Sequence, residues 1–282
     1  MLYLIFTIDG DWKEYFDVNL SEEKRLPDVG VLQRLIKQEI EVATGNLEGR
    51  FIHFVHTSPR ARKFFLNEPF IKFWRQIIEN GGDIGIHPHE DDPYKAYYFQ
   101  DISRMKDTIS GQVSALRKQG LDVCAYRGGY LAFSSDLIPI LEENGLYFDF
   151  SCEPGRYLVD SDNLVSDWRG SPTSLYRMSY HDHRKVGDSG VYEIPIGTSK
   201  GHYFYFEKST PEIIKETAFD LREKSTKDSY DIIVSVLTHT YEYTSLDEIK
   251  NIEEKISLLK KYGRFINLEK LQDIIEDLAE KS

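Results

Sequence analysis

Apolar residues along the chain occur in short continuous runs that alternate with stretches of helical periodicity. The run from Leu2 to Ile8 is rich in residues that favour strands, which is typical of a parallel strand buried on both faces. Further along, Leu32, Leu35 and Ile36 recur at the spacing of an amphipathic helix. The start of the chain therefore predicts a strand followed by a helix, and the same alternation continues to its end.

This alternation predicts an α/β fold. Strands are expected at 2–8, 51–56, 83–87, 123–126, 146–150, 191–196 and 230–238, with a short one at 264–266. Helices are expected at 28–44, 69–78, 102–116, 134–144, 210–224, 245–261 and 268–279. Strands that alternate with helices pair in parallel through crossover connections. No glycine-rich phosphate loop follows the first strand, which disfavours an open nucleotide-binding sheet. We expect a (β/α) barrel of about seven parallel strands, as a single domain over residues 1–282.

A mostly polar and irregular segment, from about Ser151 to Gly190, interrupts the alternation. Long loops inside a compact domain tend to be functional or mobile, so this segment is expected either to fold over a site or to cover core. His181-Asp182-His183 has the spacing of a ligand pair, but no clear strand precedes it, and we interpret it as a solvated loop. Four side chains of the segment are able to stack on a ring or to meet a phosphate: Trp168, Arg169, Tyr176 and Arg177.

The charge balance narrows the classes of partner. The chain carries 35 Lys and Arg against 47 Asp and Glu, a formal net charge of -12. Nucleic-acid binding rewards clustered cations, so we expect no nucleic-acid partner. No apolar run approaches the ~20 residues of a membrane span, and no basic leader precedes the run at Leu2. We therefore expect no transmembrane segment and a cytoplasmic location.

Several predicted strands end in polar residues, and in parallel α/β folds binding and catalysis gather at those ends. The first strand ends in Asp9-Gly10-Asp11, where carboxylates two positions apart on an extended chain point to the same side. The third is followed by His87, His89 and Asp91. Carboxylate and neutral imidazole are the usual ligands of a catalytic zinc, which keeps three protein ligands and an open position. These two strand ends therefore predict a metal site.

Two further strand ends carry candidate catalytic groups. The fourth strand ends in Arg127-Gly128-Gly129-Tyr130, which indicates a fixed positive charge and a close approach of the backbone. His239 follows the long apolar strand at 230–238 and is placed to act as an acid or base. Among the other histidines, His56 is able to line the mouth of the second strand, whereas His53 lies inside that strand and is interpreted as a core residue.

Taken in order, these motifs resemble those of the polysaccharide deacetylase family, carbohydrate esterase family 4 and its relatives. The resemblance covers the chain from Thr7 to His239 and rests on Thr7-Ile8-Asp9-Gly10-Asp11, Ile84-Gly85-Ile86-His87-Pro88-His89, Tyr126-Arg127-Gly128-Gly129-Tyr130 and Leu237-Thr238-His239. It implies a distorted (β/α) barrel of about seven strands, one divalent metal, and hydrolysis of an N- or O-acyl group on a sugar.

The resemblance also implies a role for each matching residue. Asp9 matches the general base, Arg127 the arginine that holds the base carboxylate, and His239 the general acid. Asp11 and His87 match two metal ligands. In the implied mechanism, the metal and a backbone N–H near Tyr130 stabilise the oxyanion of the transition state.

The sequence departs from the usual family pattern at several points. Gly10 separates two aspartates that are most often adjacent. The second metal histidine usually lies four positions after the first, where this chain has Asp91, while His89 lies two positions after. The third ligand is therefore either His89, by ligand type, or Asp91, by register. Asp167-Trp168 is a loose echo of an Asp and Trp that pack near the general acid, and Trp168 is accordingly a candidate for substrate contact.

These expectations define a predicted activity. The protein is expected to remove an N-acyl group from an amino sugar in surface-polysaccharide synthesis, with zinc as the favoured metal and cobalt, nickel or iron as alternatives. We expect the substrate to be a small sugar, nucleotide- or lipid-linked, rather than a wall polymer. Two alternatives stay open: a non-sugar amidase on the same barrel, and a sugar-binding relative without catalytic activity. Acetate release from amino sugars would distinguish a sugar deacylase from the non-sugar amidase. The presence of Asp9 and His239 argues against the relative without catalytic activity.

Overall fold

Parallel strands form the centre of the computed structural model, which describes residues 1–90, 96–160 and 162–280. Among these residues, the central strands are β1 (Leu2–Asp9), β2 (Ile52–His56), β3 (Asp83–His87), β4 (Ala125–Tyr126), β5 (Phe148–Asp149), β9 (Tyr192–Glu193) and β12 (Ile232–His239). Their order is β12-β1-β2-β3-β4-β5-β9, and each neighbouring pair is parallel. β13 (Arg264–Phe265) also pairs with β1, and β8 (Tyr176–Arg177) pairs antiparallel with β9. The predicted α/β class is confirmed.

The sheet curls round until its two ends meet. Beyond β9, Ile196 forms a parallel bridge with Ser235 of β12. Hydrogen bonds support this bridge from Gly197 N to Ser235 O (2.9 Å) and from Ser235 N to Pro195 O (2.8 Å). The bridge joins the last strand of the series to the first, so the predicted distorted barrel of about seven parallel strands is confirmed.

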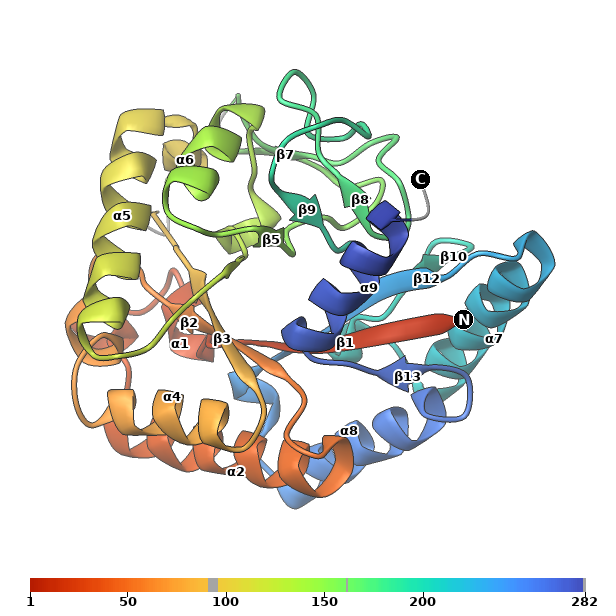
Figure 1. The fold of residues 1–282 in the computed structure, drawn as a ribbon. Helices are drawn as coiled ribbons and strands as arrows, with labels where there is room; N and C mark the ends of the chain where they lie inside the picture. Colours follow the sequence, from red (N-terminus) through yellow and green to blue (C-terminus); the bar gives the residue numbers. More distant parts are fainter. Residues whose placement is uncertain (91–95, 161, 281–282) are drawn as a thin grey trace.

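Helices cover the outside of the curled sheet, as Figure 1 shows. They are α2 (Val29–Leu47), α4 (Phe70–Glu79), α5 (Ile102–Lys118), α6 (Ile138–Glu143), α7 (Pro211–Asp228) and α8 (Leu246–Leu259), with the short α3 (Arg62–Phe65) before α4. α9 (Leu268–Glu280) instead packs Leu271 and Ile274 on residues inside the barrel, such as Ile5 and Phe148. It therefore closes the end at which the strands begin. Across the described ranges, no helix is long and apolar enough to cross a membrane.

Side chains alternate along each strand between the inside of the barrel and the outer helices, and this alternation builds both core and site. In β1, Ile5 belongs to the inner core and Asp9 lies on the same face at the carboxyl end. In β2, Phe54 and His56 repeat that arrangement. Because the carboxyl ends of parallel strands meet at one end of the barrel, four polar side chains come together there, each at most 6% exposed: Asp9, His56, His87 and His239.

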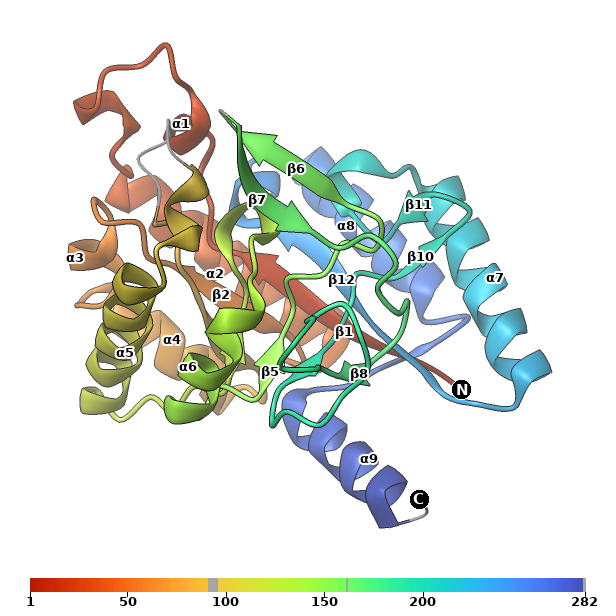
Figure 2. The same ribbon diagram turned by 90° about the horizontal axis from the view of Figure 1, so that it is seen from above.

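The segment that the sequence predicts as irregular contains a two-stranded hairpin. β6 (Tyr157–Asp160) and β7 (Asn163–Asp167) pair antiparallel. Figure 2 shows this hairpin, together with α1 (Lys13–Phe16), on the side toward which β1 points. The prediction is therefore wrong over these two strands, because apolar residues such as Val159 and Leu164 are exposed and the strands have no regular alternation that marks a buried face.

Other predicted boundaries differ from the structure by a few residues. β3 has the predicted bounds. α2 runs through Gly45 and Asn46, where the sequence predicts its end, and stops at Glu48 with a left-handed φ of 55°. A glycine costs a helix about 1 kcal/mol relative to alanine, which does not end a helix whose apolar face is packed.

Candidate metal centre and active site

At the carboxyl end of the barrel, Asp9 forms an ion pair with Arg127. Nη1 of Arg127 lies 2.6 Å from Oδ1 of Asp9 and donates to Oγ1 of Thr7 at 3.0 Å. Nε donates to the backbone oxygen of Phe150 at 2.8 Å. The guanidinium is fully buried and lies over the ring of Phe54. These contacts fix both the position of the arginine and that of the Asp9 carboxylate.

The surrounding charges decide the ionisation of Asp9. Burial by itself raises the pKa of this carboxyl, but Arg127, His87 and His239 outweigh burial and lower the pKa below its ordinary value. Asp9 is therefore ionised at neutral pH and able to accept a proton. Its second oxygen, Oδ2, lies 3.7 Å from Nε2 of His87.

Asp11, His87 and His89 converge on one point beside Asp9. Nε2 of His87 lies 3.0 Å from Nε2 of His89. These two nitrogens lie 3.7 Å and 3.5 Å, respectively, from Oδ1 of Asp11. Ligands about 2.0–2.1 Å from a tetrahedral zinc lie roughly 3.3 Å from one another, a value inside the observed range. The three side chains therefore fit a divalent metal.

His56, at the end of β2, joins this cluster. Its Nδ1 lies 2.6 Å from Oδ1 of Asp11, and its ring stacks on that of His89 with centroids 4.5 Å apart. Asp11, His56 and His89 offer one ligand atom each within 4.8 Å of one another, so they can hold a metal ion. Two roles are open to His56: direct ligand, or the residue that orients the carboxylate of Asp11 toward the ion.

The ionisation of Asp11 and His56 suits a cation between them. Burial by itself raises the pKa of Asp11, but His89, His87 and the hydrogen bond with His56 lower it well below its ordinary value. Burial lowers the pKa of His56 to about 4, and the neighbouring His89 acts in the same direction. At neutral pH the cluster therefore contains an ionised carboxylate and a neutral imidazole, the forms that bind metals.

The backbone fixes which nitrogen of His87 faces the cluster. Nδ1 lies 2.8 Å from the backbone oxygen of Arg127, so in the neutral ring Nδ1 carries the proton and Nε2 presents a lone pair. Burial by itself lowers the pKa of His87, but Asp9 and Asp11 outweigh burial and raise it. The two carboxylates thus favour positive charge at this point, which a divalent metal supplies in place of a proton.

Two glycines allow these side chains to come close. A β-carbon at Gly10 would lie 2.9 Å from Nε2 of His53 and from the backbone oxygen of Phe54. A β-carbon at Gly129 would lie 2.8 Å from the ring of His89. Both distances are too short for a real side chain, so glycine at position 10 lets the chain that carries the two aspartates pass close to β2, and glycine at position 129 leaves room for His89.

His239, at the end of β12, forms a second polar unit beside Asp9. Oε1 of Glu242 accepts a hydrogen bond from the backbone N of His239 at 2.8 Å and lies 3.2 Å from its Nδ1. The ring of Tyr241 stacks on the imidazole with centroids 4.8 Å apart, and the hydroxyl of Tyr205 lies 3.4 Å from Nε2. His239 is therefore oriented by a carboxylate on one nitrogen and directs the other into the site.

The same contacts determine the charge of His239. Burial by itself lowers its pKa, but the hydrogen bond with Glu242 and the charges of Asp9 and Asp11 raise the pKa above its ordinary value. A larger fraction of this imidazole is therefore protonated near neutral pH than of an unperturbed histidine. His239 can act as a general acid.

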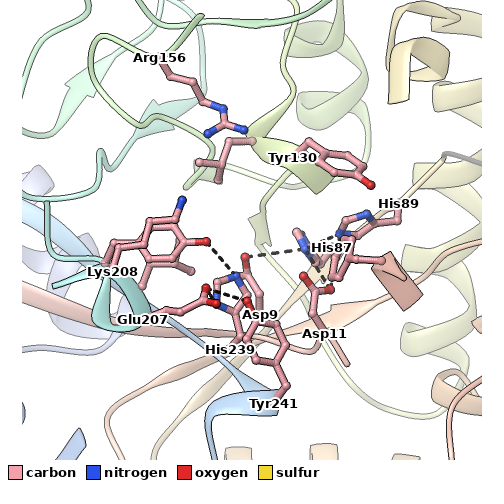
Figure 3. A pocket seen from close by; sticks show the side chains of 14 residues that line it. Asp9, Asp11, His87, His89, Tyr130, Arg156, Glu207, Lys208, His239 and Tyr241 are labelled. Carbon is pink, nitrogen blue, oxygen red and sulfur yellow. Dashed lines mark hydrogen bonds and ion pairs between the residues drawn. The ribbon is translucent and has the colours of Figure 1, made fainter. Parts of the chain in front are cut away.

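A cavity of about 290 Å³ opens over these groups. Figure 3 shows the side chains that face it, which come from both halves of the sequence. The floor consists of Asp9, Asp11, His87, His89 and His239, and the walls of Phe16, Tyr130, Leu131, Arg156, Tyr205, Glu207, Lys208, Leu237 and Tyr241. An ionised carboxylate, an imidazole and a set of metal-type ligands therefore share one cavity.

Tyr130 also reaches this cavity. It lies in the short turn Gly129–Leu131 with φ of 56°, and Leu131 follows with φ of 58°. Left-handed backbone at two successive residues other than glycine is unfavourable and tends to occur at functional sites. Asp91, the alternative third ligand, lies outside the described residues.

Trp168 does not reach the cavity. The side chain is fully buried, its Nε1 donates to the backbone oxygen of Leu131 at 2.9 Å, and its ring packs on Phe133 and His183. The structure contradicts a stacking role for Trp168, because no face of the ring is exposed. The residue instead supports from behind the turn that carries Tyr130.

Other histidines and the polar segment are also placed by the structure. His53 is buried with Nδ1 2.9 Å from Oε2 of Glu39, so its interpretation as a core residue is confirmed. The interpretation of His181-Asp182-His183 as a solvated loop is wrong for His183, which is only 9% exposed. Three other candidates of the segment are not part of the cavity lining: Arg169, Tyr176 and Arg177.

Sequence reasoning missed several residues of the site. Glu242 had a signal, since an acidic residue three positions after His239 is the spacing of a capping box. The sequence carries no such local signal for Arg156, Tyr205 and Lys208, because they lie outside the long helices and strands and their position depends on the whole fold.

Comparison with solved structures shows that several enzymes share this fold. A protein classed as a polysaccharide deacetylase from Mycobacterium smegmatis matches with a TM-score of 0.64 at 12% sequence identity, over 99% of this chain and 91% of that one. A 4-alpha-glucanotransferase from Thermococcus litoralis matches with a TM-score of 0.57 at 11% identity, over 97% and 38%. An allantoinase matches with a TM-score of 0.56 at 9% identity, over 94% and 87%. No protein-family model and no curated protein matches the sequence.

At this level of identity the likeness establishes the fold. The chain has the distorted barrel of the polysaccharide deacetylases, so the resemblance indicated by the motifs is confirmed for the structure. The three enzymes differ in their named activities, which means that the barrel alone does not select a reaction. That selection has to come from the side chains of the site.

Proposed function

We propose that this protein is a metal-dependent hydrolase that removes an N-acyl group from an amino sugar. One observation carries the proposal: a base, an acid and a cluster of metal-type ligands line a single cavity, represented by Asp9, His239 and Asp11. A site that only binds sugar has no use for an ionised carboxylate fixed by Arg127, nor for an imidazole held by Glu242.

The metal-type ligands supply the first part of the chemistry. A divalent cation held by Asp11, His87 and His89 would supply Lewis-acid chemistry, because it would polarise the acyl carbonyl and lower the pKa of water to about 7. Zinc is the proposed ion because the donors are imidazole and carboxylate, with cobalt, nickel and iron as alternatives.

Asp9 is the proposed general base. Arg127 occupies Oδ1 and leaves Oδ2 next to the metal-type ligands. As a water oxygen forms its bond to the acyl carbon, the proton of that water passes to Asp9. The turn at Tyr130 borders the same cavity and is the proposed donor to the oxyanion, a role that typically contributes ~3–4 kcal/mol.

His239 is the proposed general acid. An amide C–N bond does not break at neutral pH unless the leaving nitrogen receives a proton. As the bond breaks, its electron pair stays on nitrogen, which takes the proton from Nε2 of His239. Glu242 holds Nδ1 and so keeps Nε2 directed at the cavity. The products are a carboxylic acid and the free amine of the sugar.

The carboxyl groups of the floor disfavour glycosyl transfer on this barrel. That chemistry needs one carboxyl group that stays protonated, as an acid, beside a second that is ionised. The pKa values of Asp9 and Asp11 both lie below the ordinary value, so neither supplies the protonated group. A non-sugar amidase is the second candidate, because the same groups hydrolyse other amides and an allantoinase shares the fold.

The aromatic walls favour a sugar over other amides. Phe16, Tyr130, Tyr205 and Tyr241 line the cavity. Aromatic faces pack on the apolar faces of sugar rings, and tyrosine hydroxyls can hydrogen-bond to sugar hydroxyls at the same time. The cavity volume of about 290 Å³ is at the low end for ligand pockets, which suits a small sugar better than a long polymer.

Acetate release from defined substrates tests the proposal. The protein is stripped of metal with a chelator, reloaded with zinc, and assayed with N-acetyl amino sugars, O-acetyl sugars and allantoin. We expect acetate from an N-acetyl sugar in the zinc-loaded protein, with a loss of about 10²–10⁴-fold in Asp9→Asn, which keeps its metal. Hydrolysis of allantoin without acetate release would favour the amidase. If the zinc-loaded protein hydrolyses none of these compounds, the result would contradict the proposal that it is a hydrolase.

A further inference from the structure

Among the described residues, two cations face the cavity, Arg156 and Lys208, although the chain as a whole is acidic. Lys208 lies in the short helix η5 (Phe206–Lys208) and is exposed. Its Nζ lies 4.1 Å from the centroid of the Tyr205 ring. In the part of the chain that the structure describes, no carboxylate lies within ion-pair distance of this Nζ. The lysine charge is therefore available to a ligand.

Arg156, which immediately precedes β6, supplies the second cation. Its Nε donates to Oγ of Ser166 at 3.2 Å, and its Nη1 donates to Oε2 of Glu153 at 3.2 Å. These two contacts hold the guanidinium in place while it lines the cavity. An arginine that is already ordered loses little conformational entropy when it binds an anion. Figure 3 shows Arg156 and Lys208 reaching from different segments into the same space above the floor.

The remaining charge in the walls does not cancel these two. Glu207 is the acidic residue of the cavity walls in the described part of the chain, and its Oε2 accepts a hydrogen bond from the hydroxyl of Tyr241 at 2.8 Å. The same oxygen lies 3.9 Å from Nδ1 of His239, so this carboxylate faces the acid side of the site and not Lys208. Among the described residues, the walls therefore carry two cations and one anion, while Glu153, which pairs with Arg156, lies outside the lining.

We propose that the substrate is an acylated amino sugar with a negatively charged substituent, a phosphate or a carboxylate, and that Arg156 and Lys208 bind this substituent. The inference rests on the proposed deacylase function for the position of the acyl group, but it concerns the opposite part of the cavity. The floor takes the acyl group, the tyrosines contact the ring, and the cations meet the charge. Arginine in particular binds phosphate and carboxylate through two parallel hydrogen bonds.

Binding measurements test the charge preference without requiring turnover. Zinc-loaded Asp9→Asn protein is titrated calorimetrically with N-acetylglucosamine, N-acetylglucosamine 1-phosphate, uridine-diphosphate N-acetylglucosamine and N-acetylmuramic acid. We expect the charged sugars to bind at least about tenfold more tightly than the neutral one, with a preference that weakens as salt is raised. The phosphate and carboxylate ligands show which kind of anion the site prefers.

Substitutions of the two cations then assign the preference to them. In the same background, Arg156→Gln combined with Lys208→Met is expected to reduce the preference to about twofold or less. Arg156→Lys is expected to retain only part of the preference, because lysine keeps the charge but not the two parallel hydrogen bonds. Matched controls are Arg169→Gln, close to the same hairpin but outside the cavity lining, and Lys215→Met, exposed on α7. Both controls are expected to keep the full preference, and thermal unfolding confirms that each variant is folded.

The outcomes separate this inference from the proposed function. Equal binding of neutral and charged sugars would overturn the inference, even if the neutral sugar is deacetylated. An undiminished preference in the double variant would also overturn it, because the anion would then bind elsewhere, for example to the metal. A preference that depends on both cations, in a wild-type protein that releases no acetate, would support the inference and contradict the deacylase.

Discussion

Replacing Glu242 by glutamine should shift the pH dependence of catalysis and leave the fold intact. In the structure, Oε1 of Glu242 contacts both the backbone N and Nδ1 of His239. Glutamine has the same shape and keeps an oxygen that accepts both hydrogen bonds, so the substitution removes only a negative charge. Glu242→Gln is therefore a direct test of how the charge of His239 is controlled.

The size of the shift follows from the contacts of the imidazole. A carboxylate within about 4–6 Å of a histidine typically raises its pKa by about 1–3 units, and each unit corresponds to 1.36 kcal/mol. Glutamine keeps the hydrogen bond to His239 and removes only the Coulombic contribution of Glu242, which is smaller than those of Asp9 and Asp11, so the expected decrease lies near the low end, at about one unit. A general acid works below its pKa, so activity should be lost at a pH about one unit lower.

The assay is the pH profile of kcat for acetate release. Glu242→Gln should move the alkaline limb of the profile down by about one unit, with kcat at high pH reduced about tenfold and little change at low pH. Asp247→Asn, a 98% exposed carboxylate on α8, serves as the control and should leave the profile unchanged. An alkaline limb that does not move in Glu242→Gln would show that His239 is not the acid or that Glu242 does not set its charge.

Three further substitutions test the electrostatics and packing around the site. Burial raises the pKa of Asp83 to about 6, so the free energy of unfolding decreases as pH rises from about 4 to 6. Asp83→Asn should therefore add about 1–3 kcal/mol to the free energy of urea unfolding at pH 7 and nothing at pH 3.5. Gly129→Ala should push the ring of His89 and weaken zinc binding about tenfold in a chelator competition, whereas Gly111→Ala, with open space around it, should not. Arg127→Met leaves a buried carboxylate unpaired and should lower the free energy of unfolding by about 3–5 kcal/mol at pH 7; equal stability of wild type and variant would show that the pair is dispensable.

Much of the barrel could be predicted from the sequence because its signals are local. The apolar runs at β1, β3 and β12 are buried over nearly their full length, which leaves a continuous pattern in the sequence. The hairpin β6–β7 escaped prediction because its strands are short and its outward residues, such as Val159 and Leu164, are apolar and exposed. Closure by the bridge between Ile196 and Ser235 has no local signal at all.

The site was predictable where its residues follow strand ends. Asp9, His87 and His239 directly end buried strands, and the topology brings such ends together. His56 also ends a buried strand, but no second ligand lies nearby in the sequence, so the local pattern does not mark it as a metal ligand. The prediction that Trp168 contacts the substrate is wrong because a large aromatic residue in a polar loop suggests exposure. In the structure the surrounding rings bury the indole, which also donates a hydrogen bond to the backbone.

The most direct test of the central claim is the metal content of the purified protein and its relation to activity. We predict that elemental analysis finds about one divalent ion per chain. A chelator should remove this ion and abolish acetate release, and added zinc should restore both. Asp11→Ala and His87→Ala should lose the ion and the activity, and His56→Ala should lose the ion only if His56 is a direct ligand. Full metal content in both Asp11→Ala and His87→Ala, or acetate release that persists after the metal is removed, would contradict the account.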